Sequence, residues 1–192
     1  MKRVLAVVVV LTLLISSALA EETVRFLALD ITKDDWVKYF VAYPVAQGIF
    51  DPLFINYGVS NYATLYVWNV TDGFLIMLSC EDTTDKVTLM NASMTLDENA
   101  GNLVGLLDFI IMINNLIFAC NPELSLDEVS TIIDALDYNS VYDTPGEKDG
   151  TNYKDIQYYL FNDGKTFGFA IASVYTYNSE EAFLEYRDST IK

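Results

Sequence analysis

From Ala63 to Met94, the apolar residues have the spacing of strands rather than of helices. Apolar and polar residues there tend to alternate, and β-branched and aromatic residues are frequent, as in half-buried strands. Asp72-Gly73 separates the first two apolar runs, and aspartate followed by glycine is a strong signal for a tight hairpin turn. We therefore predict a meander of three strands, over 64–68, 74–80 and 87–94.

The same pattern returns near the C-terminus. Tyr153–Phe161 and Lys165–Tyr175 are two aromatic-rich runs joined by the turn Asn162-Asp163-Gly164. From Phe167 onward, large and small side chains alternate in the second run, so that one face of this strand carries only small residues. Because small side chains allow a helix backbone to approach closely, we expect the face with Gly168 to lie beneath a helix.

Other segments have the apolar spacing and the end signals of helices. Thr32 precedes two aspartates and an apolar stripe, and Ser125 with Glu128 forms a capping box before another stripe. The apolar stretch 101–120 contains Asp108, whose charge would be costly in hydrocarbon, so we expect a buried helix rather than a membrane span. We predict helices over 33–43, 101–120, 125–136 and 179–186.

This order of elements indicates an α+β fold. We expect an antiparallel sheet, made of the meander plus the C-terminal hairpin, with helices packed on one face. The polar segment Asp137–Asn152 contains Pro145, Gly146 and Gly150 and is predicted to be a loop.

Residues 1–20 have the pattern of a secretory signal peptide. Lys2 and Arg3 precede an apolar run from Val4 to Ile15, and small residues follow up to Ala20. The run is shorter than a membrane span, and no cysteine follows it for lipid attachment. We expect a leader over 1–20 and a single secreted α+β domain over 21–192, released outside the cell.

Charge and composition narrow the function. The chain has 11 basic and 27 acidic residues, and without the leader 9 bases and 27 acids remain, a net charge of −18. Such a surface repels phosphate and anionic lipid, so we expect neither nucleic-acid nor membrane binding. There is no histidine, which removes imidazole-based triads and histidine-bearing metal sites. We expect no cofactor.

The two cysteines, Cys80 and Cys120, favour one disulfide in an exported chain. Such a bond would require the strand face that carries Cys80 to lie under the end of the apolar helix. The alternative is a pair of buried free thiols that pack as small hydrophobic side chains.

Acidic residues suggest two kinds of site. The first is a carboxylate pair for glycoside hydrolysis, with the candidates Asp34, Asp35, Glu81, Asp82 and Asp85. The alternative is that these acids have structural roles, because acidic residues are common in the first turn of a helix and in turns between strands. The second is a calcium site among the oxygen ligands of 137–149, although Val141 and Tyr142 break the EF-hand pattern. A solvated acidic loop is the alternative there.

Aromatic residues near the predicted loop suggest a binding surface. Tyrosine gives a large contact area at low entropic cost, so we predict a partner-binding loop for a protein or carbohydrate partner. Its candidate residues are Tyr138, Tyr142, Asp143 and Tyr153. Asn69 and Asn91 lie in glycosylation sequons, which we interpret as chance matches.

The segment Asn121–Val129, between the apolar helix and the next apolar stripe, resembles small uncharacterised secreted or lipoprotein domains of Gram-positive bacteria. The resemblance covers roughly 63–175, and the chain departs from the pattern by lacking a lipobox cysteine and by carrying two other cysteines. It implies an α+β fold at a bacterial surface and no known activity.

We hypothesise a secreted, non-catalytic binding domain of unknown ligand and oligomeric state. The alternatives are an extracellular carboxylate-dependent hydrolase and a soluble inhibitor or chaperone-like partner domain.

Overall fold

The computed structural model describes residues 25–41, 55–60, 63–71, 73–96, 106–174 and 176–177. The chain divides into a compact unit over 27–174 and a second unit formed by 1–26 and 175–192. In the second unit, β1 (Arg25–Phe26) pairs antiparallel with β9 (Thr176–Tyr177). The predicted leader and the predicted helix over 179–186 lie outside the described residues, and a single domain over 21–192 stays a prediction.

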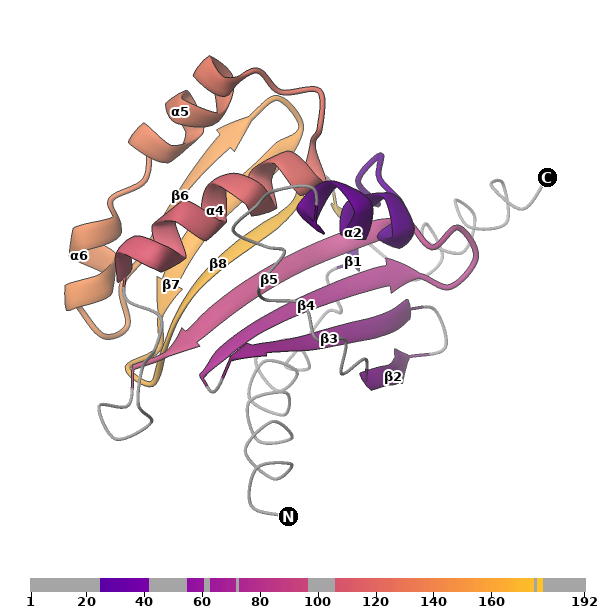
Figure 1. Cartoon of the computed structure of the whole chain (residues 1–192), viewed down its shortest axis with the longest axis horizontal. Coiled ribbons are helices and arrows are strands. Elements are labelled where there is room, and N and C mark those ends of the chain that lie inside the picture. The colour runs from indigo at the N-terminus through magenta and orange to yellow at the C-terminus, as the bar shows by residue number, and fades with distance from the viewer. Residues whose placement is uncertain are drawn as a thin grey trace, which may run out of the picture. The chain divides into compact units, whose positions relative to one another are not determined.

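The unit over 27–174 is built on a seven-stranded antiparallel sheet with the strand order β2-β3-β4-β5-β8-β7-β6 (Figure 1). The predicted meander and C-terminal hairpin form its centre, and two further strands extend its edges. The strands are β2 (Ile55–Ser60), β3 (Ala63–Thr71), β4 (Phe74–Glu81), β5 (Val87–Thr95), β6 (Lys148–Tyr153), β7 (Ile156–Asn162) and β8 (Thr166–Ser173).

The helices of the described residues lie on one face of this sheet (Figure 1), which confirms the α+β prediction. They are α2 (Lys33–Val41), α4 (Leu106–Cys120), α5 (Leu126–Asp134) and α6 (Tyr138–Asp143). Thr32 Oγ1 accepts the Asp35 backbone N–H at 3.2 Å, and Ser125 forms the predicted capping box with Glu128. No helix in the described ranges has the length and hydropathy of a membrane span.

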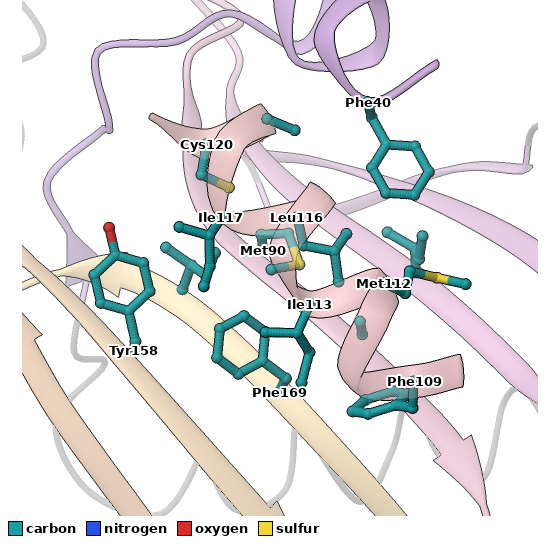
Figure 2. Close-up of a cluster of buried hydrophobic side chains, with 14 of the residues drawn as sticks. Phe40, Met90, Phe109, Met112, Ile113, Leu116, Ile117, Cys120, Tyr158 and Phe169 are labelled. Atoms are coloured by element: carbon teal, nitrogen blue, oxygen red, sulfur yellow. The ribbon is translucent and has the colours of Figure 1, made fainter. Parts of the chain in front are cut away.

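The core lies between α4 and the central strands (Figure 2). The Phe109 ring of α4 contacts Phe74 of β4 at 5.6 Å and Phe167 of β8 at 5.3 Å between ring centroids. Trp36 of α2 stacks on Trp68 of β3 at 5.7 Å. The strand face that carries Cys80 packs in this core with α4.

Within the described residues, the helices cover the face of β8 opposite to the one predicted. Phe167 and Phe169 point into the core with α4, so Gly168 lies on the opposite face of the sheet. A Cβ atom on Gly168 would lie 2.1 Å from Cζ of Phe161, the residue directly opposite on β7. The small residue therefore accommodates a ring from the neighbouring strand.

The predicted disulfide is absent, because Cys80 and Cys120 are both free and buried thiols. Cys120 Sγ accepts a hydrogen bond from Trp36 Nε1 at 3.3 Å. Burial raises the pKa of Cys120 to about 12, and burial also raises the pKa of Cys80. The two residues therefore pack as neutral core side chains, the alternative given above.

The segment predicted as a polar loop, 137–152, instead contains helix α6 and strand β6. Its acids serve as local hydrogen-bond acceptors: Asp137 Oδ1 accepts the Ser140 N–H at 3.0 Å, and Asp149 Oδ2 accepts the Asp137 N–H at 2.7 Å. Side-chain caps of this kind satisfy helix ends. The polar composition reflects these caps and an exposed edge strand rather than a loop.

Candidate functional site

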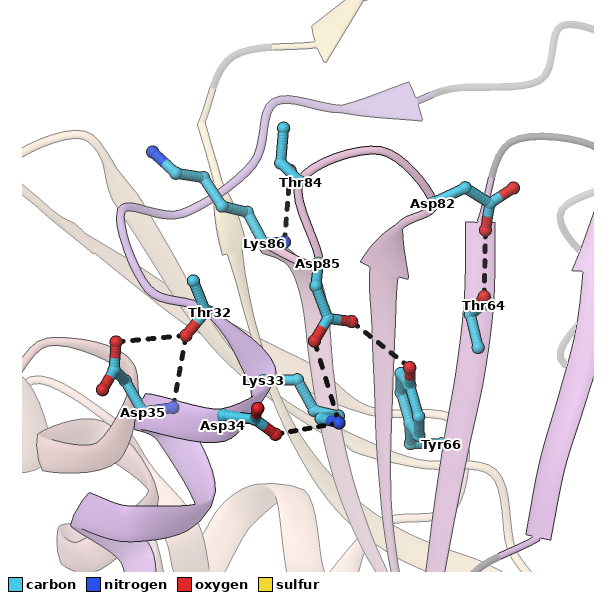
Figure 3. A network of polar contacts seen from close by, with 10 residues as sticks. All are labelled: Thr32, Lys33, Asp34, Asp35, Thr64, Tyr66, Asp82, Thr84, Asp85 and Lys86. Atoms are coloured by element: carbon cyan, nitrogen blue, oxygen red, sulfur yellow. Dashed lines mark hydrogen bonds and ion pairs between the residues drawn. The ribbon is translucent and has the colours of Figure 1, made fainter. Parts of the chain in front are cut away.

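One group of charged residues lies where the first turn of α2 meets the β4–β5 turn (Figure 3). Lys33 Nζ lies 2.9 Å from Asp34 Oδ1 and 3.7 Å from Asp85 Oδ2. Tyr66 of β3 donates its hydroxyl to Asp85 Oδ1 at 3.2 Å, and Lys33 Nζ lies 4.8 Å from the centre of the Tyr66 ring. We call these four residues the Lys33 cluster.

The electrostatics of the Lys33 cluster favour a fixed ion pair. The hydrogen bond that Lys33 donates to Asp34 raises the pKa of Lys33, although partial burial opposes the shift. Burial and the Asp85 charge raise the pKa of Tyr66. Lys33 therefore stays protonated and Tyr66 stays neutral near pH 7. The cluster ties α2 to the β4–β5 turn, where Asp85 adopts a left-handed backbone with φ 55°.

The remaining acids considered for hydrolysis have their own partners. Asp82 Oδ1 accepts the Thr64 hydroxyl at 2.9 Å, Asp35 Oδ2 accepts the Thr32 hydroxyl at 3.1 Å, and buried Glu81 accepts the Thr84 hydroxyl at 2.7 Å. These contacts do not favour a glycosidase-like pair, which stays a prediction. Within the described part of the chain, no group of three or more acidic or cysteine side chains is arranged to hold a metal ion.

A second group of acids lies on α5, on α6 and in the turn that leads to β6. The segment 121–155 has nine acidic residues and two lysines, a net charge of −7. Seven of these nine acidic residues are exposed. We call four of the seven the acidic corner: Asp127, Asp134, Asp143 and Glu147. Asp127 and Asp134 are seven residues apart on α5 and therefore lie on the same side of that helix.

The backbone under the acidic corner is held by buried and half-buried polar contacts. Asn162 of β7 is 2% exposed and donates from Nδ2 to the carbonyls of Val141 at 3.0 Å and Tyr142 at 2.8 Å. Tyr153 donates its hydroxyl to Glu128 Oε1 at 2.8 Å, which connects β6 to the first turn of α5. These contacts orient α5 and α6 and leave the corner carboxylates facing solvent.

The residues predicted for a partner-binding loop are placed differently from expectation. Tyr138 is buried in the core, and the half-buried Tyr142 packs edge-on against Phe167 at 5.3 Å. Tyr153 is half-buried and donates its hydroxyl to Glu128, so that Asp143 is the one exposed residue among these four candidates. The expectation of exposed rings is therefore wrong, while a partner at this corner stays a prediction. Asn162 is predicted only as a turn residue, because its contacts with Val141 and Tyr142 are not visible in the local sequence.

The sequon at Asn91 lies in the central strand β5, and Asn91 is 7% exposed. It is paired with Met77 on one side and Ala170 on the other. A glycan at this position is incompatible with the folded sheet. The side chain of Asn69 lies outside the described residues.

A scan against protein-family models and searches of curated proteins and of solved structures found no match to this chain. The resemblance to secreted and lipoprotein domains of Gram-positive bacteria therefore stays a prediction.

Glu128 makes part of the stability of this corner pH-dependent. Hydrogen bonds from the Ser125 backbone, Tyr153 and Lys154 lower the pKa of Glu128 from 4.5 to about 2. Because the pKa in the folded state is the lower one, this stabilisation is present above pH 4.5 and is lost as the pH falls from 4.5 to 2. We expect Glu128→Gln to destabilise the protein at pH 6 and to have a smaller effect at pH 2.5, measured by urea unfolding.

The matched control is Glu123→Gln, which removes an exposed carboxylate just before α5. Its unfolding should depend on pH in the same way as that of the wild type. An equal effect of Glu128→Gln at both pH values would argue against this linkage.

Proposed function

We propose that this protein is a secreted, non-catalytic interaction domain that binds a positively charged partner through the acidic corner. Secretion rests on the leader pattern of residues 1–20. The single observation that carries the binding proposal is the set of exposed carboxylates on α5, α6 and the following turn, held on a backbone that buried Asn162 and the Glu128 contacts orient.

The charge of the chain supports this choice of partner. A net charge of −16 attracts cationic molecules over long distances and speeds their encounter. At contact, carboxylates accept paired hydrogen bonds from guanidinium groups. Each exposed pair contributes only about 0.2–1 kcal/mol, so several carboxylates on one oriented backbone are needed for useful affinity.

The two acidic groups of the protein differ in a way that favours the corner. In the Lys33 cluster, Asp34 and Asp85 are already paired with a lysine of the same chain. In the acidic corner, Asp134, Asp143 and Glu147 are exposed to solvent. Within the described part of the chain, a cationic ligand therefore finds uncompensated charge at the corner and compensated charge at the cluster.

We expect a fluorescent arginine-rich peptide to bind with an affinity that falls as salt rises, measured by fluorescence anisotropy. The triple variant Asp134→Asn/Asp143→Asn/Glu147→Gln should bind the peptide about tenfold more weakly, because three attractive contacts are lost.

Asp30 lies near the β4–β5 turn, where its Oδ1 accepts a hydrogen bond from Lys86 Nζ at 2.7 Å. The control variant, Asp30→Asn/Asp34→Asn/Asp82→Asn, removes the same charge from this region and should bind nearly as the wild type does. Equal weakening in both variants would mean that only net charge matters. That outcome, or no binding by the wild type at low salt, would reject the proposal.

A further inference from the structure

The longest run of the chain without a charged residue, 52–71, contains the edge strand β2 and its neighbour β3. This is unusual in a protein with 38 charged residues among 192. An uncharged edge matters because the outer backbone groups of an edge strand can pair with another strand.

The two edge strands of the seven-stranded sheet differ in whether they carry charges that discourage such pairing. At one edge, β6 carries Lys148 and Asp149, and charges of this kind oppose strand addition. At the other edge, β2 has the sequence Ile-Asn-Tyr-Gly-Val-Ser, with no charge and no proline. Within the described residues, the sheet ends at β2, which pairs with β3.

The geometry of β2 suits strand addition over part of its length. Residues 55–58 follow a regular antiparallel register with β3, and a shift appears only between Gly58 and Ser60. A bulge bends a strand and discourages pairing, but this one lies near the end of β2. Among the described residues, four consecutive positions of β2 therefore form an unbroken extended edge with no strand paired on its outer side.

We propose that β2 pairs antiparallel with β2 of a second copy of this chain across a twofold axis. Two copies with a net charge of −16 each repel one another over most of their surfaces, and an uncharged edge avoids this cost. Antiparallel pairing of identical strands is self-complementary, so it forms a closed dimer rather than a chain of subunits.

The dimer would contain one continuous fourteen-stranded sheet, because β2 is the first strand of a seven-stranded order that ends at β6. The β6 edges, and the α5 and α6 helices beside them, would lie at opposite ends. A partner with two cationic sites could then contact both copies, which raises the overall affinity. The dimer itself does not depend on the proposed function.

The test is sedimentation equilibrium of the full chain over a range of protein concentrations. We expect the wild type to approach twice the mass of the chain as the concentration rises. Asn56→Glu introduces a negative charge into each of the paired strands, and it should raise the dimer dissociation constant about tenfold or more.

The matched control, Asn152→Glu, makes the same substitution on the β6 edge and should leave the dissociation constant unchanged. A wild type that stays monomeric at every concentration would overturn the proposal. So would a dimer that Asn152→Glu weakens as much as Asn56→Glu does.

Hydrogen exchange of the wild type keeps the proposal testable if Asn56→Glu fails to fold. Successive amides in a strand point to opposite sides, so about half of the β2 amides face away from β3. These amides should become protected as the protein concentration rises. Exchange in β2 that is independent of concentration in a dimeric protein would also overturn the proposal.

Discussion

Replacing Phe169 by alanine is expected to lower the free energy of unfolding by about 3–5 kcal/mol, the largest effect of a single substitution considered for this protein. Phe169 is fully buried at the centre of β8, between Ala92 of β5 and Leu160 of β7. Figure 2 shows its ring beneath Ile113 of α4. Truncation would remove apolar contact area and leave a cavity that the sheet and helix cannot close.

The measurement is urea unfolding followed by far-ultraviolet circular dichroism. Leu126→Ala is the matched control, because Leu126 is a large apolar residue that is 74% exposed on α5, and its loss should change stability by less than about 0.5 kcal/mol. Similar losses for both variants would contradict the assignment of the core to the interface between α4 and the sheet.

The second large effect is expected for Asn162→Ala. This buried side chain donates to the Val141 and Tyr142 carbonyls, and its Oδ1 accepts the Gly164 backbone N–H at 2.8 Å. The substitution leaves these backbone groups without their partner, which costs about 1–3 kcal/mol for such buried groups. Because two of the groups belong to the end of α6, the amides of this helix should also exchange faster with solvent.

Asn139→Ala is the matched control for Asn162→Ala, since Asn139 is an exposed asparagine within α6 itself. It should leave both the free energy of unfolding and the exchange of the α6 amides nearly unchanged. If Asn162→Ala has no larger effect than Asn139→Ala on either measurement, then Asn162 does not hold the acidic corner in place.

Local patterns were sufficient to predict the centre of the fold. The alternation from Ala63 onward and the turns at Asp72-Gly73 and Asn162-Asp163-Gly164 predicted five of the seven strands, because period and turn chemistry are properties of short segments. The capping signals at Thr32 and Ser125 also placed the starts of α2 and α5 correctly.

The edges of the sheet were harder to predict. β6 reads Lys-Asp-Gly-Thr-Asn-Tyr, and a strand exposed at an edge needs few apolar residues because it buries little surface. Its pairing with β7 depends on a neighbour that is not visible in its own sequence. The polar composition of the segment before β6 favours a loop, whereas its helix α6 begins at backbone N–H groups whose hydrogen bonds the Asp137 and Asp149 carboxylates accept.

Contacts between residues far apart in the sequence account for the other differences between the predicted and the observed structure. The alternation along β8 was identified correctly, but which face the helices cover depends on Phe161, a residue of another strand. For the two cysteines, residue type and expected compartment favoured a disulfide, whereas the structure places Cys120 against the indole N–H of Trp36. Neither contact follows from local spacing.

The candidate site was predicted in part. The segment 137–153 was identified as a binding region, and Asp143 is exposed there as expected. The tyrosines were misjudged because α6 turns Tyr138 into the core and sets Tyr142 against Phe167. The described surface of this corner carries charge rather than aromatic area, which favours a cationic partner.

The central claim, that the acidic corner is the binding surface, is tested most directly by NMR amide chemical shifts during titration with the arginine-rich peptide. We predict that the largest changes fall on residues 127–147, which carry the corner carboxylates. Largest changes in the Lys33 cluster and the β4–β5 turn, or no changes at saturating peptide, would contradict this account.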